Sequence, residues 1–198
     1  MKDINYHTYI SLNEFSEPGG IVIFGGSDDR DIPLCELKQA FELNQPLYNR
    51  SSNGLTVSDA LHYYDELVAP LRPETLFLHI GEADLNQFTV DPAIFDQQYR
   101  ELLHHIVETA QRTGDSLRIA VVSLRNPNSD PIIDEMNRHL KYISESEHCD
   151  YGDISQKRLW NPKETRDVVS FLYSTGFVRS LKNKRPIFDL LKILFCFE

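Results

Sequence analysis

Three short apolar runs constrain the fold of this chain more than any other feature. They are Ile21–Phe24, Thr75–Ile80 and Leu117–Leu124, and the first two are followed directly by glycine. Strands that are apolar throughout are buried on both faces, as in a parallel sheet. Leu47–Tyr48 and Asp150–Ile154 are weaker strand candidates. The sequence therefore predicts a sheet of about five parallel strands.

Amphipathic stretches separate these runs. The clearest is Asp91–Gly114, where Asp91 can cap the helix, Pro92 suits its first position and Gly114 suits its end. Asp130–Pro131 repeats the same start signal. Further apolar stripes at helical spacing are Leu34, Leu37 and Phe41, and Val57, Leu61, Tyr64, Leu67 and Val68. Strands alternating with helices predict βαβ units and a parallel sheet covered on both sides. We predict a three-layer α/β/α domain, flavodoxin-like, with strand order 2-1-3-4-5.

Length and composition fit one globular domain over residues 1–198, with 41% hydrophobic and 25% charged residues. The sequence contains no apolar run of about 20 residues, and its start lacks a basic segment followed by an apolar core. Cys35, Cys149 and Cys196 are odd in number and widely spaced, which is typical of reduced thiols. We therefore expect a cytoplasmic protein without a membrane span.

The charge balance restricts the partners. Twenty Lys and Arg face thirty Asp and Glu, for a net charge of −10. Nucleic acids and anionic lipid surfaces both require basic groups, so we expect neither as a partner. Residues 181–198 form an apolar tail with a helical stripe. That tail is expected to pack on its own domain, with a homodimer contact as the alternative.

The loop after the first run carries a candidate nucleophile. In a parallel sheet, ligands bind beyond the carboxyl ends of the strands, and Gly25-Gly26-Ser27-Asp28-Asp29 lies at such an end. Adjacent glycines followed by aspartates do not suit a phosphate, and the spacing is not that of the G-x-S-x-G elbow. Ser27 can act as a nucleophile there, or it can simply cap the helix that follows.

Three blocks together carry a family resemblance. A strand ends in G-G-S at Ser27, N-R-x-x-x-G follows over Asn49–Gly54, and another strand ends in G-x-x-D-L over Gly81–Leu85. In this order the blocks resemble the SGNH (GDSL-like) hydrolase superfamily, nearest to esterases similar to platelet-activating-factor acetylhydrolase. The resemblance covers roughly Gly20 to Phe177. It implies a hydrolase of small esters or acetylated carbohydrates that needs no cofactor.

Carried over to this chain, the resemblance assigns roles and reveals two departures. Ser27 matches the nucleophile and an oxyanion donor, Gly54 matches a second donor, and Asp167 matches the aspartate that orients the catalytic histidine. Ala83 stands where the family has an asparagine donor, and Ser170 stands where it has the histidine.

These departures affect catalysis more than folding. A serine hydroxyl cannot accept a proton near neutral pH as imidazole does, and losing one oxyanion donor costs about 10² to 10³ in rate. Two functions follow: a weakened SGNH-type esterase or acylhydrolase, or a non-catalytic protein that binds a small ester, a glycan or a partner in the same pocket. His79 is the histidine on a strand next to Ser27, and we expect it to be a hydrogen-bonded core residue.

The acidic residues at the strand ends allow a further alternative. Asp28, Asp29 and Asp84 follow the first and the second of the long apolar runs, and clustered carboxylates can hold a divalent cation. The simpler interpretation is that Asp28 and Asp29 begin a helix, whereas Asp84 is a turn carboxylate bonded to nearby N–H groups. The resemblance gives Asp84 that structural role, so we predict no metal site.

Overall fold

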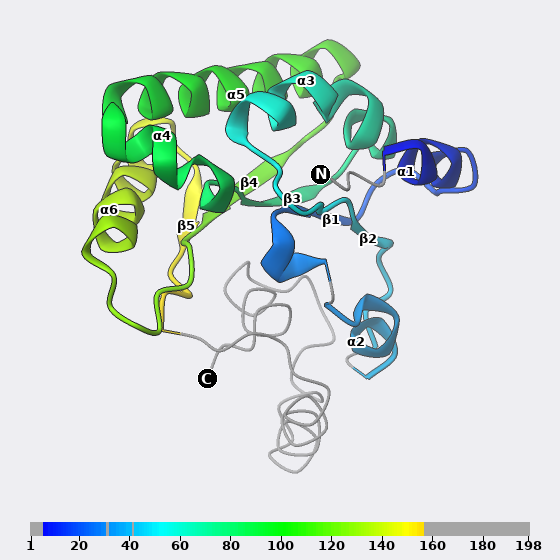
Figure 1. Cartoon of the computed structure of the whole chain (residues 1–198). Helices are drawn as coiled ribbons and strands as arrows, with labels where there is room; N and C mark the ends of the chain where they lie inside the picture. The colour runs from blue at the N-terminus through cyan, green and yellow to red at the C-terminus, as the bar shows by residue number, and fades with distance from the viewer. Residues whose placement is uncertain (1–5, 31, 41, 157–198) are drawn as a thin grey trace.

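The computed structural model describes residues 6–30, 32–40 and 42–156 (Figure 1). Asp167, Ser170, Cys196 and the tail over residues 181–198 lie outside these ranges, so the predictions made for them stay predictions. Cys35 and Cys149 are both free cysteines. No helix in the described part of the chain is long and apolar enough to cross a membrane.

One parallel sheet forms the centre of the molecule. Its order is β2-β1-β3-β4-β5, and every neighbouring pair is parallel. The strands are β1 (Ile21–Gly25), β2 (Leu47–Asn49), β3 (Thr75–His79), β4 (Arg118–Val122) and β5 (Asp150–Gly152). All five residues of β1 and the last four of β3 and of β4 are buried, as apolar runs covered on both faces require. The predicted fold class and strand order are confirmed.

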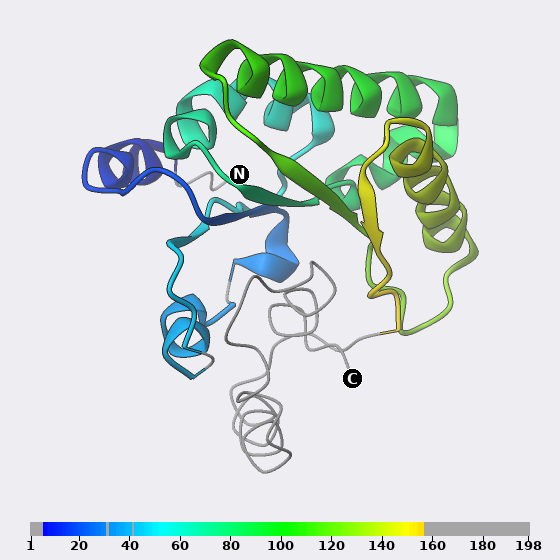
Figure 2. The ribbon, with the colours of Figure 1, turned by 180° about the vertical axis from the view of Figure 1, so that it is seen from behind.

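Helices follow the strands in alternation. They are α1 (Tyr6–Asn13), α2 (Leu34–Ala40), α3 (Val57–Leu67), α4 (Leu85–Val90), α5 (Pro92–Thr113) and α6 (Pro131–Ser146), with short 3₁₀ turns η1 (Ser27–Asp29), η2 (Ala69–Leu71) and η3 (Glu82–Asp84). Figures 1 and 2 show α3 and α5 side by side over one face of the sheet, with α2 on the other side next to β2. Helices α1 and α4 were not predicted.

The predicted helix starts agree with the structure. The Asp91 side chain accepts from the Ala93 N–H at 3.0 Å, and the Asp130 side chain accepts from the Ile132 N–H at 2.8 Å. Gly114 ends α5 with φ of 71°, a left-handed conformation that glycine adopts without strain. Each aspartate satisfies an N–H that the first turn of its helix leaves without a partner.

Arg50 explains how α1 is attached. Its guanidinium is buried and donates twice to Asn13 Oδ1, at 2.7 and 3.2 Å. The same group lies 5.1 Å from the ring centre of Tyr9 and 5.4 Å from that of Tyr48. The arginine of the second sequence block thus joins α1 to the end of β2 through charge-assisted hydrogen bonds and cation–π contacts.

Candidate active site

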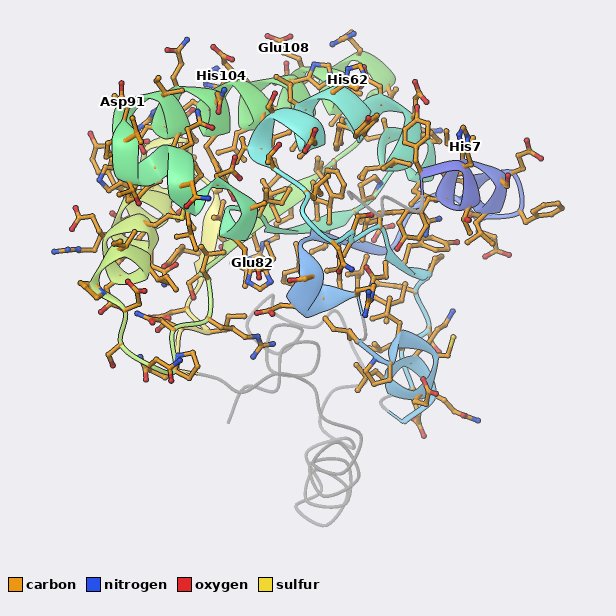
Figure 3. The ribbon with its side chains drawn as sticks, in the orientation of Figure 1. His7, His62, Glu82, Asp91, His104 and Glu108 are labelled. Carbon is orange, nitrogen blue, oxygen red and sulfur yellow. The ribbon has the colours of Figure 1, made fainter. Side chains whose placement is uncertain are left out.

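The first and third loops meet at the carboxyl end of the sheet. Strands β1 and β3 are paired with Gly25 opposite His79, so η1 and η3 start side by side. The Ser27 hydroxyl donates to Glu82 Oε2 at 2.5 Å, and the Gly26 N–H donates to the His79 carbonyl at 3.1 Å. Figure 3 shows Glu82 beside η1. The structure therefore brings together the two loops that the sequence placed at one site.

The second loop is hydrogen-bonded to the first. The Ser52 N–H donates to the Gly25 carbonyl at 3.0 Å, and the Asn49 side-chain amide donates to the Asp29 carbonyl at 2.7 Å. Gly54 follows two residues after Ser52 with φ of 69°, in the left-handed region that favours glycine. The loop is thus fixed against β1 and η1, and the Gly54 N–H as an oxyanion donor stays a prediction.

Asp84 links two elements of the fold through a hydrogen bond. It is buried, and its Oδ2 accepts from the N–H of Val57, the first residue of α3, at 3.1 Å. The contact ties η3 to the helix that begins directly after the Gly54 loop. This is the turn-carboxylate arrangement expected for Asp84, and it satisfies one of the unpaired N–H groups at a helix start.

Beneath Ser27 lies a buried pair of charged groups. Asp29 is 0% exposed and His79 is 4% exposed, and the His79 Nδ1 lies 2.9 Å from both carboxylate oxygens. Burial lowers the pKa of His79, but the charge and hydrogen bond of Asp29 outweigh it, so the pKa is raised. His79 is therefore the hydrogen-bonded core histidine that was predicted. Asp29 does lie in a helical turn, but its partner was not foreseen.

Two glycines make room for the two carboxylates. A Cβ on Gly25 would lie 1.9 Å from Asp29 Oδ2 and 2.9 Å from the His79 carbonyl oxygen. A Cβ on Gly26 would lie 3.2 Å from Glu82 Oε2. The pair of glycines before Ser27 therefore allows one carboxylate to pack under the loop and another to reach the serine hydroxyl.

Arg125 and Asp28 complete the charged surroundings. Arg125 follows the carboxyl end of β4, is buried, and places its Nε 3.3 Å from Asp28 Oδ2. Burial raises the pKa of Asp28, Glu82 and Asp29 add to this effect, and His79 and Arg125 oppose it. Glu82 and Arg125 were both missed by the sequence analysis. The signal for Glu82 was its place as the second residue of the third block, directly after the strand that pairs with β1.

Of the two positions where this chain departs from the motifs that it resembles, Ala83 lies within the described residues and Ser170 does not. Ala83 lies in η3 beside Glu82 and has only a methyl group, so its side chain cannot donate to an oxyanion. Within the described residues, no histidine side chain is hydrogen-bonded to the Ser27 hydroxyl. Three of those on helices bind carboxylates elsewhere: His104 contacts Glu147, His105 contacts Asp65 and His139 contacts Asp96, each at 2.8 Å. Nor does any group of three or more His, Cys, Asp or Glu in this part of the chain have a metal-binding arrangement.

Comparison with known proteins gives matches in structure alone. No protein-family model and no curated protein matches the sequence. An acetyl xylan esterase, AlAXEase, superposes with a TM-score of 0.59 at 12% identity, over 79% of this chain and 98% of that one. A GDSL-like lipase from Bacteroides thetaiotaomicron gives 0.57 at 14% identity, over 90% and 99% of the two chains.

A third solved structure superposes to a similar extent. It is described as a candidate platelet activating factor protein from Streptococcus pneumoniae, and it superposes with a TM-score of 0.60 at 18% identity, over 75% of this chain and 72% of that one. At such identities the likeness defines the fold, which is that of the SGNH hydrolases. The resemblance carried by the three sequence blocks is thereby confirmed at the level of the fold.

Proposed function

We propose that this chain is a slow SGNH-type serine esterase that acts on a small ester or an acetylated carbohydrate. The observation that carries the proposal is the Ser27 hydroxyl at the carboxyl end of β1, donating its proton at 2.5 Å to a carboxylate from the neighbouring loop. A hydroxyl so placed is oriented for attack on a bound carbonyl. A serine that only capped a helix would accept from a backbone N–H instead, and Ser27 does not bond in that way.

Low activity is part of the proposal. Two backbone donors, the N–H groups of Ser27 and Gly54, are left to hold the oxyanion, because Ala83 supplies none. The absence of this one donor should lower the rate by about 10²- to 10³-fold. Serine at position 170 in place of the family's histidine removes the usual base as well.

The charges around Ser27 favour an uncharged substrate. Asp28, Asp29 and Glu82 lie on or beside the serine turn, and among the described residues His79 contacts Asp29 and Arg125 contacts Asp28, whereas Glu82 contacts the Ser27 hydroxyl. A carboxylate or phosphate on the substrate would be repelled at such short range. Among the structural neighbours, AlAXEase is named as an acetyl xylan esterase, so neutral acetyl esters of sugars are the substrates we put first.

A non-catalytic role is the second candidate. The methyl group of Ala83 favours it, since this position has lost its donor on a loop that is otherwise intact. In that case the same pocket would bind an ester, a glycan or a protein partner without turning it over.

Hydrolysis of p-nitrophenyl acetate and of acetylated xylo-oligosaccharides separates the two functions. We expect slow turnover by the wild type and loss of that turnover in Ser27→Ala. Ser116→Ala is the matched control, because Ser116 is exposed and precedes β4 at the opposite end of the sheet. Turnover that Ser27→Ala leaves unchanged would favour the non-catalytic role.

A further inference from the structure

We propose that Glu82 is the general base of this site and takes the place of the missing imidazole. The inference rests on the proposed function, in which Ser27 is the nucleophile. It assigns the proton-transfer step to a residue in the third loop, where none of the motif positions carried over by resemblance supplies a base.

The contact between Ser27 and Glu82 has the geometry expected of a general base that is hydrogen-bonded to its nucleophile. The 2.5 Å between Ser27 Oγ and Glu82 Oε2 lies in the range of a hydroxyl bound to an ionised carboxylate, about 2.5 to 2.7 Å. A general base needs a direct hydrogen bond to the proton that it removes. Glu82 has this contact and is itself exposed, so water can reach its carboxylate for the second half of the reaction.

The other titratable and charged groups facing this contact have other partners. Asp29 of η1 binds His79 of β3 in the buried pair, and Asp28 of η1 pairs with Arg125 from the loop after β4. Asp84, on the same turn as Glu82, accepts from the start of α3. In the described part of the chain, Glu82 is thus the carboxylate that contacts the Ser27 hydroxyl.

The backbone is built to permit the contact. The missing side chain of Gly26 leaves the space that Glu82 Oε2 enters, since a Cβ there would lie 3.2 Å from that oxygen. The parallel register of β1 with β3 sets Ser27 two residues after Gly25 and Glu82 three residues after its partner His79. The turns that carry Ser27 and Glu82 therefore begin next to each other, within reach of a glutamate side chain.

The reaction balances with water as the only co-reactant. The Ser27 proton passes to Glu82 Oε2 while Oγ bonds to the ester carbon, and the carbonyl oxygen becomes the oxyanion. Collapse breaks the carbon–alkoxide bond, and Glu82 returns the proton to the leaving alcohol. Water then attacks the acyl-enzyme and gives a proton to Glu82. Release of the acid restores the Ser27 hydroxyl with that proton.

Glu82→Gln tests this role. Glutamine keeps an oxygen that can accept from Ser27, but it cannot take the proton. General-base catalysis typically contributes 10² to 10⁴ in rate, and a carboxylate is a weaker base than imidazole, so we expect kcat for p-nitrophenyl acetate to fall about 100-fold with little change in KM. Glu108→Gln is the control, because Glu108 is exposed on α5, far from η1 in Figure 3. It should match the wild type.

The pH profile supplies an independent readout. Wild-type kcat should fall on the acid side as the base becomes protonated, and Glu82→Gln should lose this acid limb. Suppose Ser27→Ala abolishes turnover but Glu82→Gln keeps the wild-type rate and profile, or is faster. Then Glu82 is not the base, while the proposed function stands. If wild-type turnover does not depend on Ser27, the proposed function fails, and this inference fails with it.

Discussion

Two carboxylates lie at the same short turn, η1, and they differ in burial: Asp29 is buried, whereas Glu82 is exposed. Asp29 is the last residue of η1, and its side chain is buried against His79. Glu82 reaches over the turn from η3 and is exposed beside the partly exposed Ser27. We call the first contact the inner pair and the second the outer pair.

The difference in burial suits the inner pair to a structural role and the outer pair to a chemical one. A buried charge without its partner is very unfavourable, so the inner pair is confined to one arrangement and holds the turn in place. The outer pair is in contact with water, because Glu82 is exposed and Ser27 is partly exposed. In the proposed site, the inner pair can therefore hold the turn of the nucleophile rigid, while the outer pair can take part in proton transfer.

Breaking the inner pair should give the largest effect on stability. Asp29→Asn leaves His79 buried without its counter-charge, and such losses cost about 3 to 5 kcal/mol. Urea unfolding measures this difference. Glu82→Gln, on the outer pair, should stay within about 0.5 kcal/mol of the wild type. Equal effects from the two substitutions would contradict the comparison.

A side-chain donor at position 83 should change the rate of the reaction at the outer pair and leave the stability that depends on the inner pair unchanged. Ala83→Asn places an amide where the resemblance to the SGNH hydrolases expects one, and we expect the barrier to fall by about 3 kcal/mol at most. Ester turnover would rise while the urea midpoint stays constant. Adding Ser170→His should not give a simple sum of the two gains, because nucleophile, base and donors act as a unit. An unchanged rate for Ala83→Asn would place position 83 away from the oxyanion.

The two glycines allow a finer contrast. Gly25→Ala directs its methyl into Asp29 and the His79 backbone, so we expect a loss of about 1 to 3 kcal/mol in unfolding free energy. Gly26→Ala meets only the flexible end of Glu82, so it should lower turnover with little loss of stability. Denaturation and ester hydrolysis on both variants check this. The reverse pattern would show that the outer pair, not the inner one, holds the turn.

The smallest expected effect is a pH dependence of stability. The folded-state pKa of His79 is raised by Asp29 against the effect of burial, above its ordinary value of about 6.5. The stability that this protonation contributes is therefore complete below about pH 6.5 and is lost as the pH rises through the folded value. Urea unfolding from about pH 6.5 to 9 should show a decline in the wild type that Asp29→Asn lacks. A rise over this range would contradict the account of the inner pair.

Much of the fold could be predicted because its signals are local. The apolar runs marked β1, β3 and β4 as buried parallel strands, and the Asp-Pro starts and Gly114 marked two long helices. Helix α1 was not predicted because none of its residues is buried. It is held by a hydrogen bond from Arg50, which is distant in sequence. Helix α4 is a short helix directly after η3, without a side-chain cap at its start.

For the candidate site, the sequence predicted which loops meet, while the roles of their residues stay predictions. Ser27, the Gly54 loop and Asp84 were carried by short motifs, and the structure brings their loops together. Glu82 and Arg125 were missed because their contacts arise from strand pairing and from the loop after β4, which no spacing in the sequence encodes. The pairing of β1 with β3 places the turn that carries Glu82 next to the turn that carries Ser27, but it does not by itself single out Glu82.

The central claim, that Ser27 is a nucleophile, is tested most directly by a fluorophosphonate probe. The serine oxygen bonds to phosphorus as fluoride leaves, and the adduct is stable, so even a slow site accumulates label. The account predicts one label on the peptide that contains Ser27 in the wild type, slower labelling in Glu82→Gln and none on that peptide in Ser27→Ala. A wild-type protein that remains unlabelled at Ser27 after long exposure would contradict it.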